Sequence, residues 1–354
     1  MAHDNGAAAR RAVARDEETT GPATLAEVMA EVEEQAARGE VERLRPMATG
    51  FNPLDDILNG GLRPGELLMI GGPFGVGKTI WGLQAARNVV LVDPNNWAMY
   101  VCYEHDRPHL MMRLMCMESA ERGNKDDALT LRRIADLSLN APAGQGLVRG
   151  LKRTPRYAPL IEALESYSDR LYLVKASGDH STLDDVRRWV EEALDSGARA
   201  GRFLLVVDYL QKIPIPLASL QPETEVTTIL TQGLKEIAMS LGIQVIAIAA
   251  SDRLGLKARR MRLADLRGSS ALQYEADVGL ILNNKYAILS REHMVYNPSG
   301  AEAYRNWVVM SVEKNRAGRN AVDMEYQLDA AHFRIVPNGD FVRERLVDEK
   351  VILE

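Results

Sequence analysis

The chain has 354 residues, 46% of them hydrophobic, and a formal net charge of −6 at pH 7. This length allows one large α/β domain or two small ones, and the hydrophobic fraction excludes wholesale disorder. A nucleic-acid partner would need a local basic surface, because the overall charge is acidic. Two cysteines, Cys102 and Cys116, exclude a disulfide framework and fit a reducing compartment, where we expect both thiols to be buried.

Residues 1–22 are rich in Ala, Arg and acidic residues and end in Gly-Pro, which predicts a flexible tail. Neither this tail nor any later segment has the apolar run of a signal peptide or a membrane span, so we expect a cytoplasmic protein. Thr24 can cap a helix over 25–37 whose apolar residues share one face, and Gly39 ends it. This helix must bury its apolar stripe in its own domain or on a neighbour.

The phosphate-binding P-loop is the most specific motif, with the sequence Gly72-Pro73-Phe74-Gly75-Val76-Gly77-Lys78-Thr79. An apolar strand at 67–70 precedes it and a helix at 79–89 follows, which is the context that the motif requires. Its glycines allow backbone N–H groups to surround a phosphate at the positive end of a helix. Lys78 can reach the β- and γ-phosphates and Thr79 can bind Mg²⁺. The alternative is a plain glycine-rich turn.

Two apolar strands end in acidic residues. The strand 203–207 ends at Asp208, which in P-loop enzymes positions Mg²⁺ or its water shell. The strand 98–103 ends at Glu104, which can orient the attacking water as a catalytic base, and Asp106 is the second choice. The alternatives are a carboxylate that caps a strand for Asp208 and a solvated loop residue for Glu104.

The remaining pattern alternates strands with helices, which predicts a mostly parallel sheet flanked by helices. Further strands are predicted at 171–174, 245–249, 278–282 and 308–312, and further helices at 108–122, 182–196 and 225–241. The segment 139–159 reads as a surface excursion, and 323–328 with 332–335 as a short hairpin. After the strand 308–312, Lys314 and Arg316 precede a glycine turn; from chemistry alone, a solvated basic turn is favoured over a pair that neutralises a transferred phosphoryl group.

Six motifs occur in an order that resembles the RecA-like C-terminal ATPase domain of DnaB-type replicative DNA helicases, over residues 25–337. They are the opening motif Thr49-Gly50-Phe51-Asn52-Pro53-Leu54-Asp55; Gly61-Leu62-Arg63-Pro64-Gly65 leading into the P-loop; Tyr103-Glu104 with Leu110 and Arg113-Leu114; Asp208-Tyr209-Leu210-Gln211; Asp265-Leu266-Arg267-Gly268-Ser269 continuing to Ala276-Asp277; and Lys314-Asn315-Arg316.

The resemblance implies a RecA-like P-loop NTPase core preceded by a linker helix, with ATP and Mg²⁺ as ligands. The nucleotide would be bound by Gly72, Gly75, Val76, Gly77, Lys78, Thr79, Ile80 and Asp208, with Thr79 and Asp208 as the Mg²⁺ ligands. Glu104 and Lys78 would act within one subunit, and Lys314 and Arg316 would reach the ATP site of the adjacent subunit. The predicted organisation is a tail at 1–22, a linker helix in 23–46 that docks on a neighbouring subunit, an ATPase domain at 47–340 and a C-terminal tail at 341–354.

Two features depart from the family. Ala250 stands where the family carries a glutamine that senses the γ-phosphate and links it to the DNA loops, which puts the coupling of hydrolysis to translocation in question. The loop 212–223, which in the family helps to grip single-stranded DNA, has a single lysine. A second segment is richer in cations, and we expect some of them to contact phosphates, although a solvated basic loop is the alternative. These cations are Arg253, Lys257, Arg259, Arg260, Arg262 and Arg267.

The sequence therefore supports an ATP-driven hexameric DNA helicase domain that acts on single-stranded DNA in replication, with a replication or loader protein as a further partner. The alternative is an ATP-switched protein that assembles into rings or filaments and does not unwind DNA; Ala250 favours it. A recombination or clock-type ATPase of the wider RecA-like group is a third hypothesis, because one fold hosts many functions.

Overall fold

The computed structural model describes residues 21–39, 45–123, 127–142, 144, 146–198, 200–215, 222–251, 258–266, 268–289 and 301–347. The chain divides into two compact units, Met1–Glu42 and Arg43–Glu354, which are described separately below.

The first unit contains the helix α1 (Leu25–Ala37), whose bounds are those predicted from the sequence. Thr24 and Glu27 form a capping box, in which the Thr24 hydroxyl accepts from the Glu27 N–H at 3.3 Å and the Glu27 carboxylate accepts from the Thr24 N–H at 2.7 Å. None of the residues of α1 is buried, and Leu25 and Met29 expose 76% and 62% of their surface. Within its own unit, the helix therefore presents an apolar stripe that no other described residue covers.

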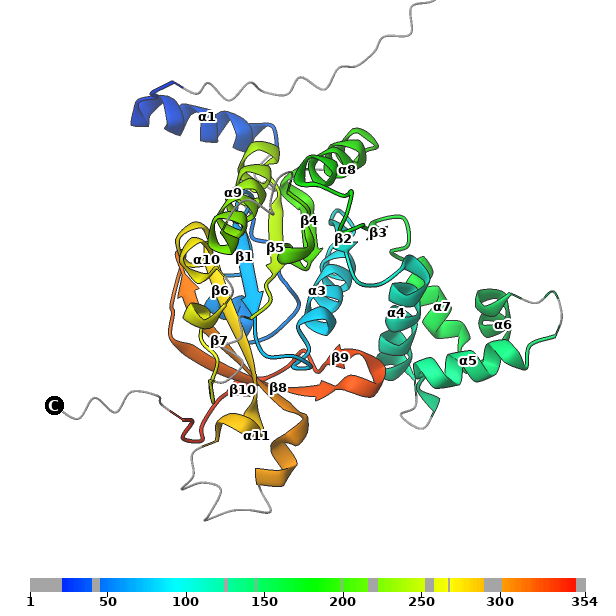
Figure 1. Cartoon of the computed structure of the whole chain (residues 1–354). Helices are drawn as coiled ribbons and strands as arrows, with labels where there is room; N and C mark the ends of the chain where they lie inside the picture. The colour runs from blue at the N-terminus through cyan, green and yellow to red at the C-terminus, as the bar shows by residue number, and fades with distance from the viewer. Residues whose placement is uncertain are drawn as a thin grey trace, which may run out of the picture. The chain divides into compact units, whose positions relative to one another are not determined.

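The second unit is built on one twisted sheet, which has ten strands within the described residues (Figure 1). The strands are β1 (Leu67–Gly71), β2 (Trp97–Cys102), β3 (Leu171–Lys175), β4 (Phe203–Asp208), β5 (Gln244–Ile248), β6 (Val278–Asn284), β7 (Trp307–Asn315), β8 (Val322–Asp329), β9 (Arg334–Ile335) and β10 (Asp340–Phe341). Their order is β10-β8-β7-β6-β1-β5-β4-β2-β3, and β9 pairs with β8. The strands from β6 to β3 are parallel, whereas β7, β8, β9 and β10 extend the sheet with antiparallel pairs.

The helices of this unit are α2 (Leu54–Ile57), α3 (Lys78–Val92), α4 (Arg107–Arg122), α5 (Leu131–Leu139), α6 (Leu147–Arg153), α7 (Ala158–Glu165), α8 (Leu183–Asp195), α9 (Glu223–Leu241), α10 (Ser269–Glu275) and α11 (Lys285–Ile288). Short 3₁₀ turns complete the set: η3 (Ala200–Arg202), η4 (Leu210–Lys212), η7 (Leu263–Asp265), η8 (Ala303–Asn306) and η9 (Ala330–His332).

Two apolar layers cover the two faces of the sheet. Leu68 and Ile70 of β1 pack with α3 on one face, and Leu67 and Met69 pack with α8, α9 and α10 on the other (Figure 1). All residues of β1, β4 and β5 are buried. This double burial explains why these strands appear in the sequence as continuous apolar runs, and the predicted mostly parallel sheet flanked by helices is confirmed.

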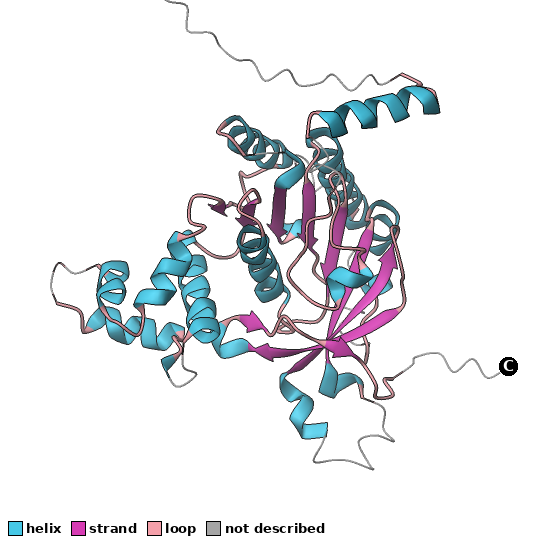
Figure 2. Ribbon diagram, turned by 180° about the vertical axis from the view of Figure 1, so that it is seen from behind, coloured by secondary structure: helices cyan, strands magenta, loops and turns pink. Residues whose placement is uncertain are grey.

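The helices α4 to α7 form a group beside the sheet, which Figure 2 shows from behind. Met115 and Cys116 of α4 pack with Ile134, Leu151 and residues of α7 in a small separate core. The prediction of a surface excursion at 139–159 is therefore wrong in part, because α6 lies within this segment and buries Leu151. Its short, mixed pattern of Gly, Pro and basic residues hid the helix.

The cysteines, the C-terminal hairpin and the last described residues also have defined environments. Cys102 and Cys116 are free and buried, as expected, and β8 with β9 forms the predicted short hairpin. In the described part of the chain, no helix has both the length and the apolarity needed to cross a bilayer. Among the described residues after Phe341, Leu346 is buried and forms a bridge with Leu289.

Candidate nucleotide-binding site

The P-loop connects the carboxyl end of β1 to the first residue of α3, where the sequence motif places it. Gly77 precedes α3 with a φ of 101°, and Gly72 has a φ of 150°. A Cβ added to Gly72 would lie 2.4 Å from the Leu282 carbonyl oxygen, so the loop passes close to the backbone of β6. Phe74 and Gly75 at the tip of the loop are exposed. The glycines thus permit a tight turn that leaves the N-terminus of α3 open to an anion.

Lys78 lies inside this turn, where its ammonium donates to the Gly72 and Pro73 carbonyl oxygens at 2.7 and 2.8 Å. Burial lowers the pKa of Lys78 to about 8, while the charges of Asp208 and Glu104 oppose the shift. A cation in this setting is short of anionic partners, and phosphate oxygens would supply them. Val76 is buried in the core and Ile80 is partly buried, so a phosphate contact from either would come from its backbone N–H.

Asp208 ends β4 and is almost fully buried, with 1% of its surface exposed. The Tyr100 hydroxyl donates to its Oδ2 at 2.7 Å. Burial raises the pKa of Asp208, and hydrogen bonds from Tyr100 and Thr79 oppose this shift. The hydroxyl of Thr79 and the carboxylate of Asp208 therefore lie side by side, and both are oxygen donors of the kind that Mg²⁺ prefers.

Glu104 follows β2, the strand that pairs with β4, and its side chain is exposed. Its charge acts on both Lys78 and Asp208, which places the carboxylate at the same end of the sheet as the P-loop. The second choice from the sequence, Asp106, is the N-cap of α4 and accepts from the His109 N–H at 2.9 Å. Because Asp106 is engaged in capping, Glu104 remains the better candidate for a base.

Two groups at this site were not assigned a role from the sequence. Tyr100 is inside β2 and reads there as an ordinary core residue, yet it holds Asp208. Arg113 lies nine residues after Glu104 in α4, and its charge opposes the raised pKa of Asp208. The Nε of Arg113 is buried with no hydrogen-bond partner among the described residues. The resemblance contained Arg113, but only the folded chain places its charge near the nucleotide site.

ATP and Mg²⁺ fit this set of residues. The open helix N-terminus and a buried lysine that is bonded to loop carbonyls suit a polyphosphate. The adjacent oxygen donors of Thr79 and Asp208 suit a hard divalent cation. An exposed carboxylate close by suits the activation of water.

Lys314 and Arg316 lie at the opposite end of the sheet, where β1 and β6 begin. Lys314 pairs with Gly279 near the start of β6, and its ammonium donates to the Gln273 and Tyr274 carbonyls. Arg316 donates to Asp277 Oδ1 at 3.1 Å, and Asp277 Oδ2 accepts from the N–H of Leu67 at the start of β1. The length of β1 separates them from the P-loop, about 16 Å at 3.3 Å per residue. One chain therefore does not bring these cations to its own P-loop.

The predicted DNA-contacting residues have different environments. The Arg259 side chain donates to the Leu289 carbonyl at 2.9 Å, and Arg262 pairs with Glu313 at 3.2 Å and is 37% exposed. Arg260 is buried, and its guanidinium donates to Ser311 Oγ and to Asp323 Oδ1 at 3.2 and 2.5 Å. A phosphate contact by Arg260 would require that this pairing opens. Three further predicted positions lie outside the described residues: Arg253, Lys257 and Arg267.

Ala250 follows β5, the strand between β1 and β4 in the sheet. The Ala249 N–H donates to the Ile70 carbonyl, which puts Ala250 beside the start of the P-loop. The Ala250 N–H donates to Oε1 of Gln211 at 2.9 Å. An amide side chain is therefore present next to this position, but it comes from the segment after Asp208.

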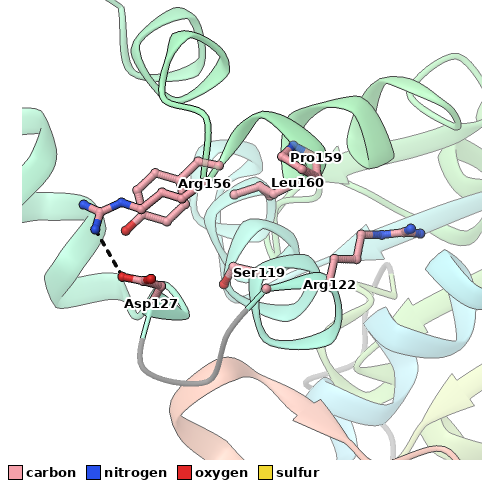
Figure 3. Close-up of a pocket in the computed structure, with 8 residues that line it drawn as sticks. Ser119, Arg122, Asp127, Arg156, Pro159 and Leu160 are labelled. Carbon is pink, nitrogen blue, oxygen red and sulfur yellow. Dashed lines mark hydrogen bonds and ion pairs between the residues drawn. The ribbon is translucent and has the colours of Figure 1, made fainter.

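Two pockets among the described residues contain no P-loop residue. One, lined by Met99, Tyr172 and Trp189 among others, is an open groove of about 330 Å³ beside the edge strand β3. The other lies between α4 and α7 and has a volume of about 20 Å³, enough for one water molecule (Figure 3). Arg156 and Asp127 pair across it at 3.1 Å.

Comparison with known proteins identifies the family. The family model described as the DnaB-like helicase C terminal domain matches residues 46–141 and 146–335. The replicative DNA helicase DnaB of Treponema pallidum (strain Nichols) is 28% identical over 245 residues, which cover 67% of this chain and 48% of the relative. The chain spans about half the length of such curated relatives.

Two solved structures share the fold. One, described as an ATPase domain, superposes with a TM-score of 0.67 at 18% identity, covering 89% of this chain and 99% of that one. A DnaB-like replicative helicase, described with its interactions with primase, gives a TM-score of 0.64 at 18% identity, covering 90% and 67%. Since the family model matches most of its length, the chain belongs to the DnaB-like helicase C-terminal domain family.

Proposed function

We propose that this chain is the ATPase domain of a ring-forming, DnaB-like motor that hydrolyses ATP with Mg²⁺ and acts on single-stranded DNA in replication. One observation carries the proposal. The P-loop, Asp208 and Glu104 lie at the carboxyl ends of the parallel strands, while Lys314 and Arg316 lie at the amino ends of β1 and β6. A site that uses both sets requires two copies of the chain arranged head to tail.

The first copy binds the triphosphate and activates water. Backbone N–H groups of the P-loop and the Lys78 ammonium hold the β- and γ-phosphates. Thr79 and Asp208 would hold Mg²⁺, which would supply charge neutralisation at the phosphate oxygens. Glu104 orients a water molecule and takes its proton as the water oxygen bonds to the γ-phosphorus and the bond to the ADP oxygen breaks. Tyr100 keeps the Asp208 carboxylate oriented through its hydrogen bond.

The second copy supplies positive charge. Lys314 and Arg316 would leave their contacts with α10 and Asp277 and approach the γ-phosphate of the neighbouring copy. Negative charge on the transferred phosphoryl group and the leaving oxygen is then balanced from outside the first subunit. The exposed P-loop tip, with Phe74 and Gly75, leaves the site open to such a neighbour. Arg113 adds a cation from within the first copy.

The helix α1 would stabilise this assembly. Its uncovered apolar stripe, with Leu25, Val28, Met29 and Val32, is suited to docking on a neighbouring subunit. This gives a linker helix within 23–46 and an ATPase domain at 47–340, with tails at 1–22 and 341–354. A closed ring of six copies is the arrangement that the resemblance favours.

Single-stranded DNA would pass the basic segment after β5, where Arg259 and Arg262 are the described residues with partly exposed guanidinium groups. A replication partner is also proposed. The similar DnaB-like helicase is described with its interactions with primase, and a primase or a loader would be the corresponding partner here. The replication setting implies a cytoplasmic location.

A second function is favoured by Ala250. Position 250, beside the P-loop, is an alanine and carries no side-chain amide of its own. Coupling of the bound nucleotide to DNA through this residue would therefore be weak. The chain could then act as a nucleotide-controlled assembly protein that forms rings or filaments without unwinding DNA. Both hypotheses share the same ATP site.

The ATPase rate with and without single-stranded DNA separates them. For the motor we expect severalfold stimulation by an oligonucleotide and displacement of a strand from forked DNA. For the assembly protein we expect an unchanged rate and nucleotide-dependent polymers in electron micrographs. Lys78→Ala is the control, because it should abolish turnover in both cases. A Lys78→Ala variant with unchanged turnover would overturn the assignment of the P-loop.

A further inference from the structure

Two imidazoles lie directly beside the candidate catalytic glutamate. His105 follows Glu104, and His109 is one helical turn later in α4. Their rings stack, with centroids 4.7 Å apart and planes 27° from parallel. Nη2 of Arg113 lies 2.8 Å from Nε2 of His105. The Arg113 guanidinium also lies over the Phe333 ring, with its Cζ 4.9 Å from the ring centroid. Arg113 thus contacts both an imidazole and a phenyl ring.

This contact determines which ring nitrogen of neutral His105 carries the proton. A guanidinium has donors only, so Nε2 of His105 must be the acceptor and carries no proton. The proton of the neutral ring is then on Nδ1. If His105 gains a second proton, Nε2 becomes a donor and both groups are cations, so the hydrogen bond is replaced by repulsion.

We propose that His105 is a positioning residue which, in its neutral form, holds the Arg113 guanidinium toward the phosphate site and releases it on protonation. The inference rests on the ATPase function proposed above. It adds a pH-dependent element to that site: Arg113 is in place when His105 is neutral, and becomes mobile when the pH falls below the pKa of this histidine.

The surroundings keep His105 neutral near pH 7. Burial lowers its pKa, and the charges of Arg113 and His109 lower it further. Glu104 and Asp106, from the segment before α4, act in the opposite direction. The turn η9 packs against α4 from the other side, and its His332 is paired with Asp329 at 2.8 Å. Burial and the charge of Arg113 also lower the pKa of His109, and the charge of Asp106 opposes this shift.

The position of Arg113 gives this contact a functional consequence. Its charge acts on Asp208, and its buried Nε has no hydrogen-bond partner among the described residues. A bond from Nη2 to His105 fixes the plane of the guanidinium and leaves its other N–H groups free to point toward an anion. Loss of the bond leaves a long side chain with several rotamers, which contributes less to binding the transition state.

Two substitutions at one position separate the hydrogen bond from the charge. In His105→Gln, the amide oxygen can occupy the place of Nε2 and accept from Arg113, but it does not titrate. In His105→Leu the acceptor is lost. We expect kcat/KM for ATP near the wild-type value in His105→Gln and about tenfold lower in His105→Leu at pH 7.5. Wild type should lose activity as the pH falls below 6.5, because the pKa of His105 is lowered from that value, and this loss should be steeper than in His105→Gln. His180→Gln, on an exposed turn, is the matched control.

A spectroscopic measurement tests the geometry without any turnover. Long-range ¹H–¹⁵N spectra of histidine-labelled protein report which ring nitrogen carries the proton, and His105→Gln identifies the signals. We expect the Nδ1–H tautomer for His105 at pH 7.5. Arg113→Met should raise the pKa of His105, because it removes a neighbouring cation. An Nε2–H tautomer, or a pKa that does not respond to Arg113→Met, would overturn the proposal.

The two levels of inference fail in different ways. If Lys78→Ala leaves turnover unchanged, the proposed function is wrong, while the tautomer of His105 can still be as described. If Lys78→Ala abolishes turnover but His105→Leu matches wild type in rate and in pH profile, the ATP site stands and the role of His105 is refuted.

Discussion

The proposed ATP site uses residues from the two opposite ends of the sheet, which predicts a defined outcome when two inactive variants are mixed. Lys78→Ala removes the lysine that is proposed to hold the phosphates, and Arg316→Ala removes the cation that is proposed to reach the neighbour. An arginine in this role contributes about a thousandfold or more to the rate, so each variant alone should retain less than about 1% of the wild-type activity. In a mixture, a junction is active when an Arg316→Ala copy supplies the P-loop and a Lys78→Ala copy supplies Arg316.

The expected activity follows from counting junctions. With equal amounts and random assembly, the copy that supplies the P-loop is the Arg316→Ala variant with a probability of one half. The copy that supplies Arg316 is the Lys78→Ala variant with the same probability, so about a quarter of the junctions are complete. The mixture should therefore reach about a quarter of the wild-type rate. Recruiting Arg316 costs little, because its pair with Asp277 is 52% exposed on the arginine side and such pairs contribute about 1 kcal/mol at most. The gain of about a thousandfold corresponds to about 4 kcal/mol and exceeds this cost.

The assay is phosphate release after the two variants have been mixed without nucleotide and allowed to exchange subunits. Arg305→Ala is the matched control, because this arginine is on η8, pairs with Glu302 and is 60% exposed. It should behave as wild type. A mixture that stays as inactive as its components, while native electrophoresis shows mixed assemblies, would refute a shared site. Full activity of Arg316→Ala alone would refute the role of this residue.

Three further predictions concern groups within one copy. Glu104→Gln should bind nucleotide with near wild-type affinity but hydrolyse it at least a hundredfold more slowly, since an amide cannot accept the proton of water; a wild-type rate in single-turnover kinetics would place the base elsewhere. Nucleotide affinity of the free protein should fall as pH rises through about 8, where Lys78 loses its charge; a fluorescent ADP titration at pH 7 and 9 tests this, and the fall should be absent in Lys78→Arg. Glu118→Gln should lower the free energy of unfolding by about 1.5–3 kcal/mol in urea titrations, because it removes the charge at the 2.7 Å contact with the buried Arg87, which keeps Glu121 as its second carboxylate partner. Glu165→Gln, in a half-exposed pair with Lys152, should cost less than about 1 kcal/mol, and equal losses in the two variants would contradict the argument.

The parallel core was predictable from the sequence because burial on both faces leaves a local signature. The apolar runs Leu67–Ile70 of β1, Phe203–Val207 of β4 and Val245–Ile248 of β5 are continuous, and the sequence marks the ends of the first two with Gly71 and Asp208. The helix α1 was predictable to the residue because its cap is local, with Thr24 and Glu27 three positions apart. The P-loop needs only its own eight residues and its two flanks to be identified.

The remaining features depend on contacts between distant residues. Arg260 reads as one of several exposed cations, but Ser311 and Asp323, more than fifty positions later, enclose it. Arg113 and Tyr100 appear as ordinary members of a helix and a strand until β2, β4 and α4 meet around Asp208. The direction of β7 also cannot be read from its apolar pattern, yet this direction decides that Lys314 lies away from the P-loop.

The opposite positions of the P-loop and of Arg316 link nucleotide binding to assembly in either proposed function. If one ATP contacts both copies, it binds an assembled pair more tightly than a single chain, and the same factor must strengthen assembly when ATP is bound. Contact between the cations Lys314 and Arg316 and a neighbour's nucleotide would also release the Tyr274 carbonyl and Asp277, which these cations hold in the single chain. Asp277 in turn accepts from Leu67 at the start of β1, the strand that carries the P-loop. If such a release moves β1, a change at one junction would reach the P-loop at the next junction, which is the minimum physical requirement for copies that hydrolyse ATP in sequence rather than independently.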